Sequence, residues 1–244
     1  MQYRQLGKSG LLVSELCFGA MSFGRQGYWE KIGGLDQKAA DRLVQIALDG
    51  GINFFDTADV YSYGQSEEIL GKALKGKRDQ VVLATKVRGR MSPEINDVGL
   101  SRRHIIQSCE NSLRRLGTDY VDLYIVHSFD FMTPLEETLS ALNDLVHQGK
   151  VRYLGCSNFH AWQLMKALSL SEKHHWEKFV SLQAYYSLVA RDVELELVPL
   201  CEDQGLGVTP WSPLAGGFLT GKYPRGGKGP QDARRSKEEQ NFIQ

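Results

Sequence analysis

Short apolar runs alternate with helix-forming segments along most of this chain. Seven runs have the length and composition of strands, at residues 16–21, 53–56, 81–87, 121–127, 153–157, 180–184 and 207–211. Between them, apolar residues cluster on one helical face, for example over residues 36–49 and 104–116. Thr133 followed by Pro134 predicts the N-cap and first turn of another helix. Continuously apolar strands that alternate with helices predict a parallel sheet covered by helices.

Two architectures fit this alternation, an open doubly wound sheet and a closed (β/α) barrel. An open dinucleotide-binding sheet carries the pattern G-x-G-x-x-G after its first strand. Residues 19–24, with the sequence GAMSFG, lack this pattern. The sequence therefore favours an α/β fold of the (β/α)8 TIM-barrel type. A short hairpin predicted over residues 3–16, with its turn at residues 7–10, would close the bottom of the barrel.

The residues after Trp211 do not supply an eighth strand. Residues 216–235 are rich in glycine, proline and basic residues, and residues 236–240 have the pattern of an opening helix. A barrel of seven strands has two unpaired edges. We therefore expect one barrel domain over residues 1–244 that lacks the last β/α unit, either as a shortened version of a longer protein or completed by a partner, for example in a homo-oligomer.

Composition excludes several classes of partner. Lys+Arg and Asp+Glu both number 29, and a formal net charge of zero argues against nucleic acid or an anionic membrane as the main partner. The four cysteines form no CxxC pair, which predicts a reduced, cytoplasmic chain with no zinc or other metal site. No signal peptide is visible, and no apolar run approaches the ~18 residues that span a membrane.

Polar residues stand where most of the predicted strands end. Asp56, Lys86 and His127 end three of them, and Tyr61 follows Asp56 by five positions. In a parallel barrel the carboxyl ends of all strands meet at one mouth, where the loops build the active site. Each residue also has an ordinary explanation: Asp56 can cap a helix, Lys86 can extend its ammonium to solvent, and His127 can be a bonded core histidine. Their coincidence at one rim favours a functional site.

The chemistry of this rim follows from its residue types. A lysine at a buried strand end needs a counter-ion, and Asp56 is the natural one. A cation beside Tyr61 would lower the pKa of the phenol from its ordinary value of about 10 and make it a better proton donor. His127 can donate a hydrogen bond to a substrate oxygen. Together these groups would protonate an oxygen on which negative charge develops, as in carbonyl reduction.

A second set of residues suits a hydride-carrying cofactor. Ser157, Asn158 and Gln183 offer hydroxyl and amide groups for a carboxamide, and Trp211 offers a flat face for a nicotinamide ring. The loop that follows can approach a pyrophosphate, and Lys222 can add a charge contact. The loop residues assigned to this role are Ser212, Pro213, Leu214 and Gly216.

Taken together, the set Asp56, Tyr61, Lys86 and His127 resembles the catalytic tetrad of the aldo-keto reductases. The segment GINFFDTADVYSYG at residues 51–64 resembles the first signature of that family. Further similar segments are residues 101–124, GCSNF at 155–159 and PWSPLAGG at 210–217. The resemblance covers essentially the whole chain. It is strongest to the general reductases of bacteria and plants and to the potassium-channel β subunits.

The resemblance implies a (β/α)8 barrel that binds NADPH and transfers hydride to an aldehyde or ketone. By position, Tyr61 would be the general acid, Asp56 and Lys86 would tune it, and His127 would orient the carbonyl. Because the β subunits replace the tetrad histidine, His127 favours an ordinary reductase. The family grips the 2′-phosphate of NADPH with a motif in its last helix and strand. This sequence ends before that motif, so the preference for NADPH over NADH is implied by the resemblance alone.

Two other functions fit parts of the sequence. A shortened barrel can act as a non-catalytic, nucleotide-sensing or scaffolding subunit. A Schiff-base aldolase could use Lys86, but an imine-forming lysine must be neutral and Asp56 should keep it charged. The apolar and aromatic segments 21–29 and 129–132 predict a small-molecule carbonyl substrate with an apolar or aromatic body, although Trp29 and Phe129 fit equally well as loop anchors.

Overall fold

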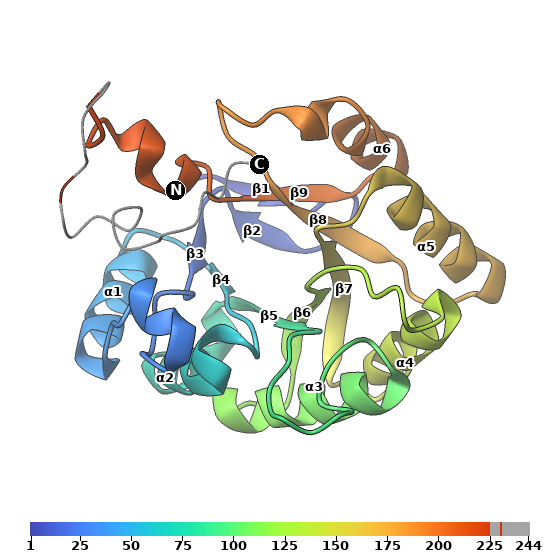
Figure 1. The fold of residues 1–244 in the computed structure, drawn as a ribbon, viewed down its shortest axis with the longest axis horizontal. Helices are drawn as coiled ribbons and strands as arrows, with labels where there is room; N and C mark the ends of the chain where they lie inside the picture. The colour runs from blue at the N-terminus through green and yellow to red at the C-terminus, as the bar shows by residue number, and fades with distance from the viewer. Residues whose placement is uncertain (225–229, 231–244) are drawn as a thin grey trace.

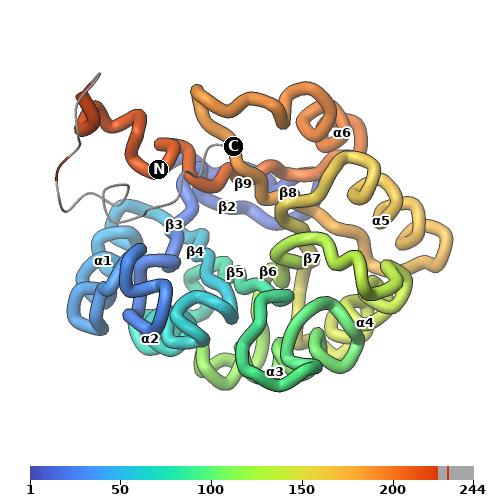
Figure 2. Tube along the Cα trace, viewed as in Figure 1, coloured from blue at the N-terminus to red at the C-terminus, as the bar shows by residue number. Residues whose placement is uncertain are grey.

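The computed structural model describes residues 1–224 and 230. Seven parallel strands form one sheet in the order β3-β4-β5-β6-β7-β8-β9 and curve around a central axis (Figures 1 and 2). Their bounds are β3 (Cys17–Gly19), β4 (Phe54–Asp56), β5 (Val82–Val87), β6 (Val121–Val126), β7 (Val151–Ser157), β8 (Phe179–Tyr185) and β9 (Gly207–Trp211). The helices on the outside are α1 (Gln37–Asp49), α2 (Gln65–Ala73), α3 (Arg102–Leu116), α4 (Leu135–His147), α5 (Ala161–His174) and α6 (Leu197–Gln204).

This arrangement confirms the predicted α/β barrel of TIM type. Within residues 1–224, no strand pairs with the outer edges of β3 and β9. The helix predicted to open at residues 236–240 lies outside the described residues, and the single domain over 1–244 stays a prediction. None of the helices in the described part of the chain is long and apolar enough to cross a membrane.

Local signals explain where the helices begin. Asp36 caps α1 by accepting a hydrogen bond from the Ala39 amide at 2.9 Å. The predicted cap at Thr133 is wrong, because Pro134 occupies the N-cap position of α4. The Thr133 hydroxyl instead donates to Asp130 at 2.8 Å, and no side chain caps α4.

Two apolar layers separate the inside of the barrel from its outside. The inner layer consists of Phe54, Val82, Ala84, Leu123 and Ile125, together with Leu6 and Val13 of the hairpin β1 (Tyr3–Gln5) and β2 (Leu12–Ser14). The outer layer lies between the strands and the helices. The Lys8 amide donates to the Gly205 carbonyl at 2.8 Å, just before β9 begins. The hairpin therefore closes the end where strands start, as predicted, and the mouth lies at their carboxyl ends.

Candidate active site

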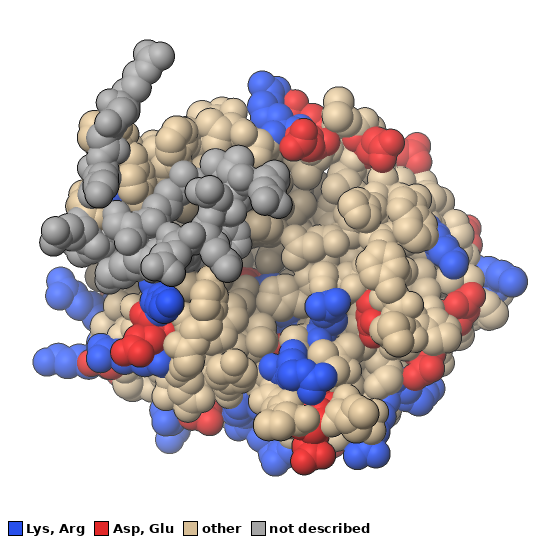
Figure 3. All heavy atoms as spheres, viewed as in Figure 1, with Lys and Arg blue, Asp and Glu red and all other residues tan. Residues whose placement is uncertain are grey.

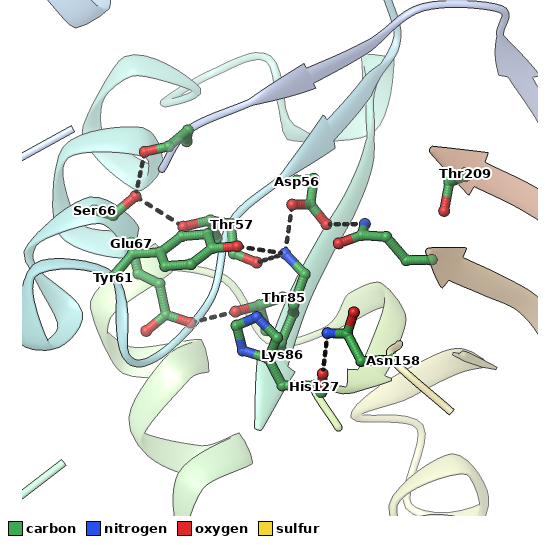
Figure 4. A network of polar contacts seen from close by, with 12 residues as sticks. Asp56, Thr57, Tyr61, Ser66, Glu67, Thr85, Lys86, His127, Asn158 and Thr209 are labelled. Carbon is green, nitrogen blue, oxygen red and sulfur yellow. Dashed lines mark hydrogen bonds and ion pairs between the residues drawn. The ribbon is translucent and has the colours of Figure 1, made fainter. Parts of the chain in front are cut away.

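A buried ion pair lies at the centre of the mouth (Figure 4). Lys86 on β5 is completely buried, and its ammonium donates to Asp56 at the end of β4 and to the Thr57 carbonyl at 2.8 Å. The strand register pairs Asp56 with Ala84, which brings the lysine two residues further along within reach. Burial opposes the charge on Lys86, but Asp56 and Tyr61 together outweigh it, so the pKa of this lysine is raised. The ammonium is charged, which argues against an imine-forming lysine.

Tyr61 reaches the same ammonium from the loop after β4. Its phenol oxygen accepts a hydrogen bond from Lys86 at 3.3 Å. The ring lies edge-on to Trp29, with centroids 5.1 Å apart, and edge-on to His127 at 5.7 Å. Tyr61 begins a short 3-10 segment, η2 (Tyr61–Gly64), in which Ser62 has a φ of 48°. The phenol is thus packed between two rings and held by one cation.

The expected direction of the Tyr61 pKa shift is wrong. Burial raises the pKa of the phenol, and the lowering by Lys86 does not outweigh burial. The charge of Asp56 raises it further. Burial removes water from the phenolate, and this costs more free energy than the nearby Lys86 ammonium supplies, because that ammonium is also paired with the Asp56 carboxylate. Tyr61 therefore keeps its proton at neutral pH.

His127 follows β6 directly and is held by its backbone. Its amide donates to the Val87 carbonyl at 3.0 Å. Burial lowers the pKa of the imidazole to about 3, with smaller contributions from the cations Lys86 and Arg88. His127 is therefore neutral, and its ring can offer one N–H group and one acceptor nitrogen.

A second polar network lies behind Tyr61, and sequence reasoning missed it. Glu67 on α2 is completely buried, accepts from the Thr85 hydroxyl at 2.5 Å and pairs with Arg115 at 2.6 Å. Asp59 is also buried, and one of its oxygens has no partner. Burial and the neighbouring Glu67 raise the pKa of Asp59. The signal available in the sequence was Glu67 at helical spacing from the apolar residues Leu70 and Leu74.

The residues assigned to a cofactor lie on the other side of the mouth. Ser157 at the end of β7 is buried, and its hydroxyl has no partner. Asn158 links its neighbours, since its amide donates to the His127 carbonyl at 2.9 Å and accepts from the Trp211 indole at 3.0 Å. Trp211 stacks on Tyr185 with centroids 4.7 Å apart. The unpaired Ser157 hydroxyl and the Asn158 amide have the chemistry to bind the carboxamide of a nicotinamide, and the Trp211 indole fits the nicotinamide ring.

Gln183 has a different contact from the one expected. Its side-chain amide donates to the second oxygen of Asp56 at 3.1 Å. The contact crosses the barrel interior from β8 to β4 and orients the carboxylate that pairs with Lys86. Gln183 therefore belongs to the ion-pair network. Of the two residues, Ser157 is the one with a buried, unpaired polar group, its hydroxyl.

The predicted phosphate loop follows β9 and turns tightly. Ser212 has a φ of 54° and Gly216 a φ of 61°, and the short segment η5 (Ala215–Thr220) begins there. Pro213 and Leu214 in this loop are exposed. Lys222 returns onto the loop, because a Cβ atom at Gly217 would come within 2.8 Å of its side chain. These residues therefore form one continuous, partly exposed surface beside Trp211.

Fold and site define a parallel-barrel protein with a buried Lys–Asp pair, a phenol and a neutral imidazole at its mouth. Residues 15–243 match the model of the Aldo/keto reductase family, and the chain belongs to that family. It is an oxidoreductase, of a family that uses NAD(P)H.

Curated relatives cover most of the chain. The oxidoreductase YrpG of Bacillus subtilis is 44% identical over 97% of this chain and 73% of its own length. Versiconal hemiacetal acetate reductase of Aspergillus parasiticus is 40% identical over 90% of this chain and 69% of its own length. A probable voltage-gated potassium channel subunit beta of Oryza sativa subsp. japonica is 44% identical over 96% of this chain and 70% of its own length. The family thus includes proteins named as reductases and proteins named as probable channel subunits.

Proposed function

We propose that this chain reduces aldehydes or ketones to alcohols with NADPH, and that Tyr61 is the general acid. The observation that carries the proposal is the buried chain from Asp56 through the Lys86 ammonium to the Tyr61 phenol, with the His127 ring beside it. Such an arrangement supplies a proton from Tyr61 and a hydrogen bond from His127 to one oxygen.

Each residue contributes through its protonation state. Tyr61 is protonated at neutral pH and gives its proton to the carbonyl oxygen as negative charge develops there. Lys86, 3.3 Å from the phenol oxygen, stabilises the phenolate that remains. Neutral His127 donates a hydrogen bond to the same oxygen without adding charge. The carbonyl carbon gains a hydride, its oxygen gains a proton, and solvent returns the proton to Tyr61.

When bound, NADPH would supply the hydride. Ser157 and Asn158 would hold its carboxamide, and Trp211 would lie against the nicotinamide. Gln183 would act mainly through Asp56, to which it is bonded. The phosphates would lie on the loop residues Ser212, Pro213, Leu214, Gly216 and Lys222. The unpaired Ser157 hydroxyl supports this assignment.

The walls of the mouth support a substrate with an aromatic or apolar body. Trp29 lies directly against the Tyr61 ring, which makes it a wall of the site. Phe129 packs against Phe159 and Trp162, with centroids 5.3 and 6.0 Å apart, and therefore also anchors its loop.

The experiment is NADPH oxidation in the presence of 4-nitrobenzaldehyde, followed by nucleotide absorbance. Tyr61→Phe should lower kcat by about 10²- to 10⁴-fold, because the acid is lost while the packing is kept. Tyr63→Phe is the matched control, since Tyr63 is 48% exposed on the same turn and should keep full activity. Full activity of Tyr61→Phe would refute the proposed acid.

A second candidate function is a nucleotide-sensing subunit without turnover. The identity of 44% to the rice protein named as a channel subunit favours it. Tight NADPH binding by wild-type protein, with no oxidation by any of several reactive aldehydes, would support this function and exclude the reductase.

A further inference from the structure

Arg88 is the first residue beyond β5 and stands beside His127. The register pairs Val87 with Val126, so the next residues along the two strands are Arg88 and His127. Neighbouring strands lie about 4.8 Å apart. Burial, Lys86 and then Arg88 lower the pKa of His127, so the charge of Arg88 reaches the imidazole. Arg88 therefore belongs to the edge of the candidate active site.

Arg88 lies one residue beyond the carboxyl end of β5, where the mouth of the barrel is. Lys86, two residues earlier, holds the ion pair at that mouth. The backbone of Arg88 has a φ of 137°, in the region that favours glycine. Such strain in a large residue is retained mostly at functional sites.

The Arg88 side chain has no hydrogen-bond or ion-pair partner among residues 1–224. It is partly exposed, but its Nε atom is buried and unbonded. Asp130 is close enough to feel its charge, yet both carboxylate oxygens already accept hydrogen bonds. Their donors are Leu100 N at 2.8 Å, Met132 N at 2.9 Å and Thr133 Oγ1 at 2.8 Å. A partly desolvated guanidinium without a partner costs free energy that an anionic ligand would recover.

We propose that Arg88 is a specificity-determining residue that binds a carboxylate carried by the carbonyl substrate. This inference rests on the proposed reductase function, because Tyr61 and His127 would hold the carbonyl end of the same molecule. The guanidinium fork matches the two oxygens of a carboxylate. Figure 3 shows Lys and Arg side chains near the centre of this face of the molecule. The preferred substrates are then aldehydes or ketones with an acidic substituent.

The test compares 4-carboxybenzaldehyde with 4-nitrobenzaldehyde, which share a ring and differ in charge. We expect Arg88→Gln to lower kcat/KM for the carboxylate by about 10- to 100-fold relative to the nitro compound. Arg88→Lys should restore part of the loss, because it returns the charge without the fork. Arg103→Gln is the control. It removes one charge from an exposed position of α3 and should leave kcat/KM for both aldehydes unchanged.

The outcomes separate this inference from the reductase proposal. Equal losses for both aldehydes in Arg88→Gln would overturn the inference and show that Arg88 only supports the structure of the site. A lack of turnover of either aldehyde by wild-type protein would refute the reductase. In that case, calorimetric binding of 4-(hydroxymethyl)benzoate tests the anion site. A tenfold weaker affinity in Arg88→Gln than in the wild type supports the inference. Equal affinity in the two proteins, or no binding to the wild type, overturns it.

Discussion

The Lys86 ammonium lies 3.3 Å from the phenol oxygen of Tyr61, although the two residues are 25 positions apart in the sequence. Both side chains are buried, and Asp56 is the counter-ion. A buried cation must be neutralised for the fold to persist. The contact that we propose to serve catalysis is therefore also one on which stability depends.

Breaking the buried pair should destabilise the protein strongly. Lys86→Met leaves the Asp56 carboxylate without its cation, and we expect a loss of about 3 to 5 kcal/mol in the free energy of unfolding. The double variant Lys86→Met/Asp56→Asn removes both charges and should recover most of that loss. Urea unfolding of the wild type, both single variants and the double variant measures the coupling. Purely additive losses would contradict the assigned pairing.

The His127 imidazole should make stability sensitive to acid. The folded protein takes up this proton only near pH 3, whereas the unfolded chain takes it up near 6.5. The stabilisation is therefore complete above pH 6.5 and is lost as pH falls towards 3. Between pH 7 and pH 5, this group alone should remove about 2 kcal/mol from the free energy of unfolding.

Urea unfolding of variants at pH 7 and pH 5 isolates this effect. His127→Gln should flatten the dependence on pH by about the same 2 kcal/mol. His147→Gln, at an exposed position of α4, should behave as the wild type does. An identical pH dependence in wild type and His127→Gln would show that the pKa of His127 is the same in the folded and unfolded protein, and would contradict the lowered pKa.

Nicotinamide binding should quench tryptophan fluorescence through Trp211. The Asn158 amide holds the indole at the mouth, so quenching that saturates with NADPH should be largely lost in Trp211→Phe. Trp29 also lies at the site, beside Tyr61, and Trp29→Phe is the control that should retain the quenching. A parallel titration with NADH tests the expected preference for the 2′-phosphate. Unaltered quenching in Trp211→Phe would place the nicotinamide elsewhere.

Helices α2 and α3 approach closely at Gly71. A Cβ atom there would lie 2.3 Å from the Leu116 carbonyl oxygen, and this contact is with backbone that cannot rotate away. Gly71→Ala should therefore lower the free energy of unfolding by about 1 to 3 kcal/mol. Gly10→Ala is the control, because nothing lies within 4 Å of the added atom. Thermal unfolding compares the two, and equal midpoints would mean that the helices separate at little cost.

The order of strands and helices could be predicted because it depends on local pattern. Each apolar run that became a strand is readable without its neighbours, and a parallel sheet then brings Asp56, Lys86 and His127 to one mouth. Contacts that link distant strands could not be predicted. Gln183 bonds to Asp56 across 127 positions. Nothing in the sequence around Gln183 shows whether its side chain binds Asp56 or the carboxamide of a cofactor.

The polar side chains that stand at the strand ends can be identified from sequence alone, because alternation and chain order are properties of neighbouring residues. Their charge states depend on the folded barrel. Tyr61 lies beside a cation, which alone would lower the pKa of its phenol, yet its pKa is raised. The reason is that burial is produced by atoms from the whole barrel, and the loss of water around a charge outweighs one favourable neighbour.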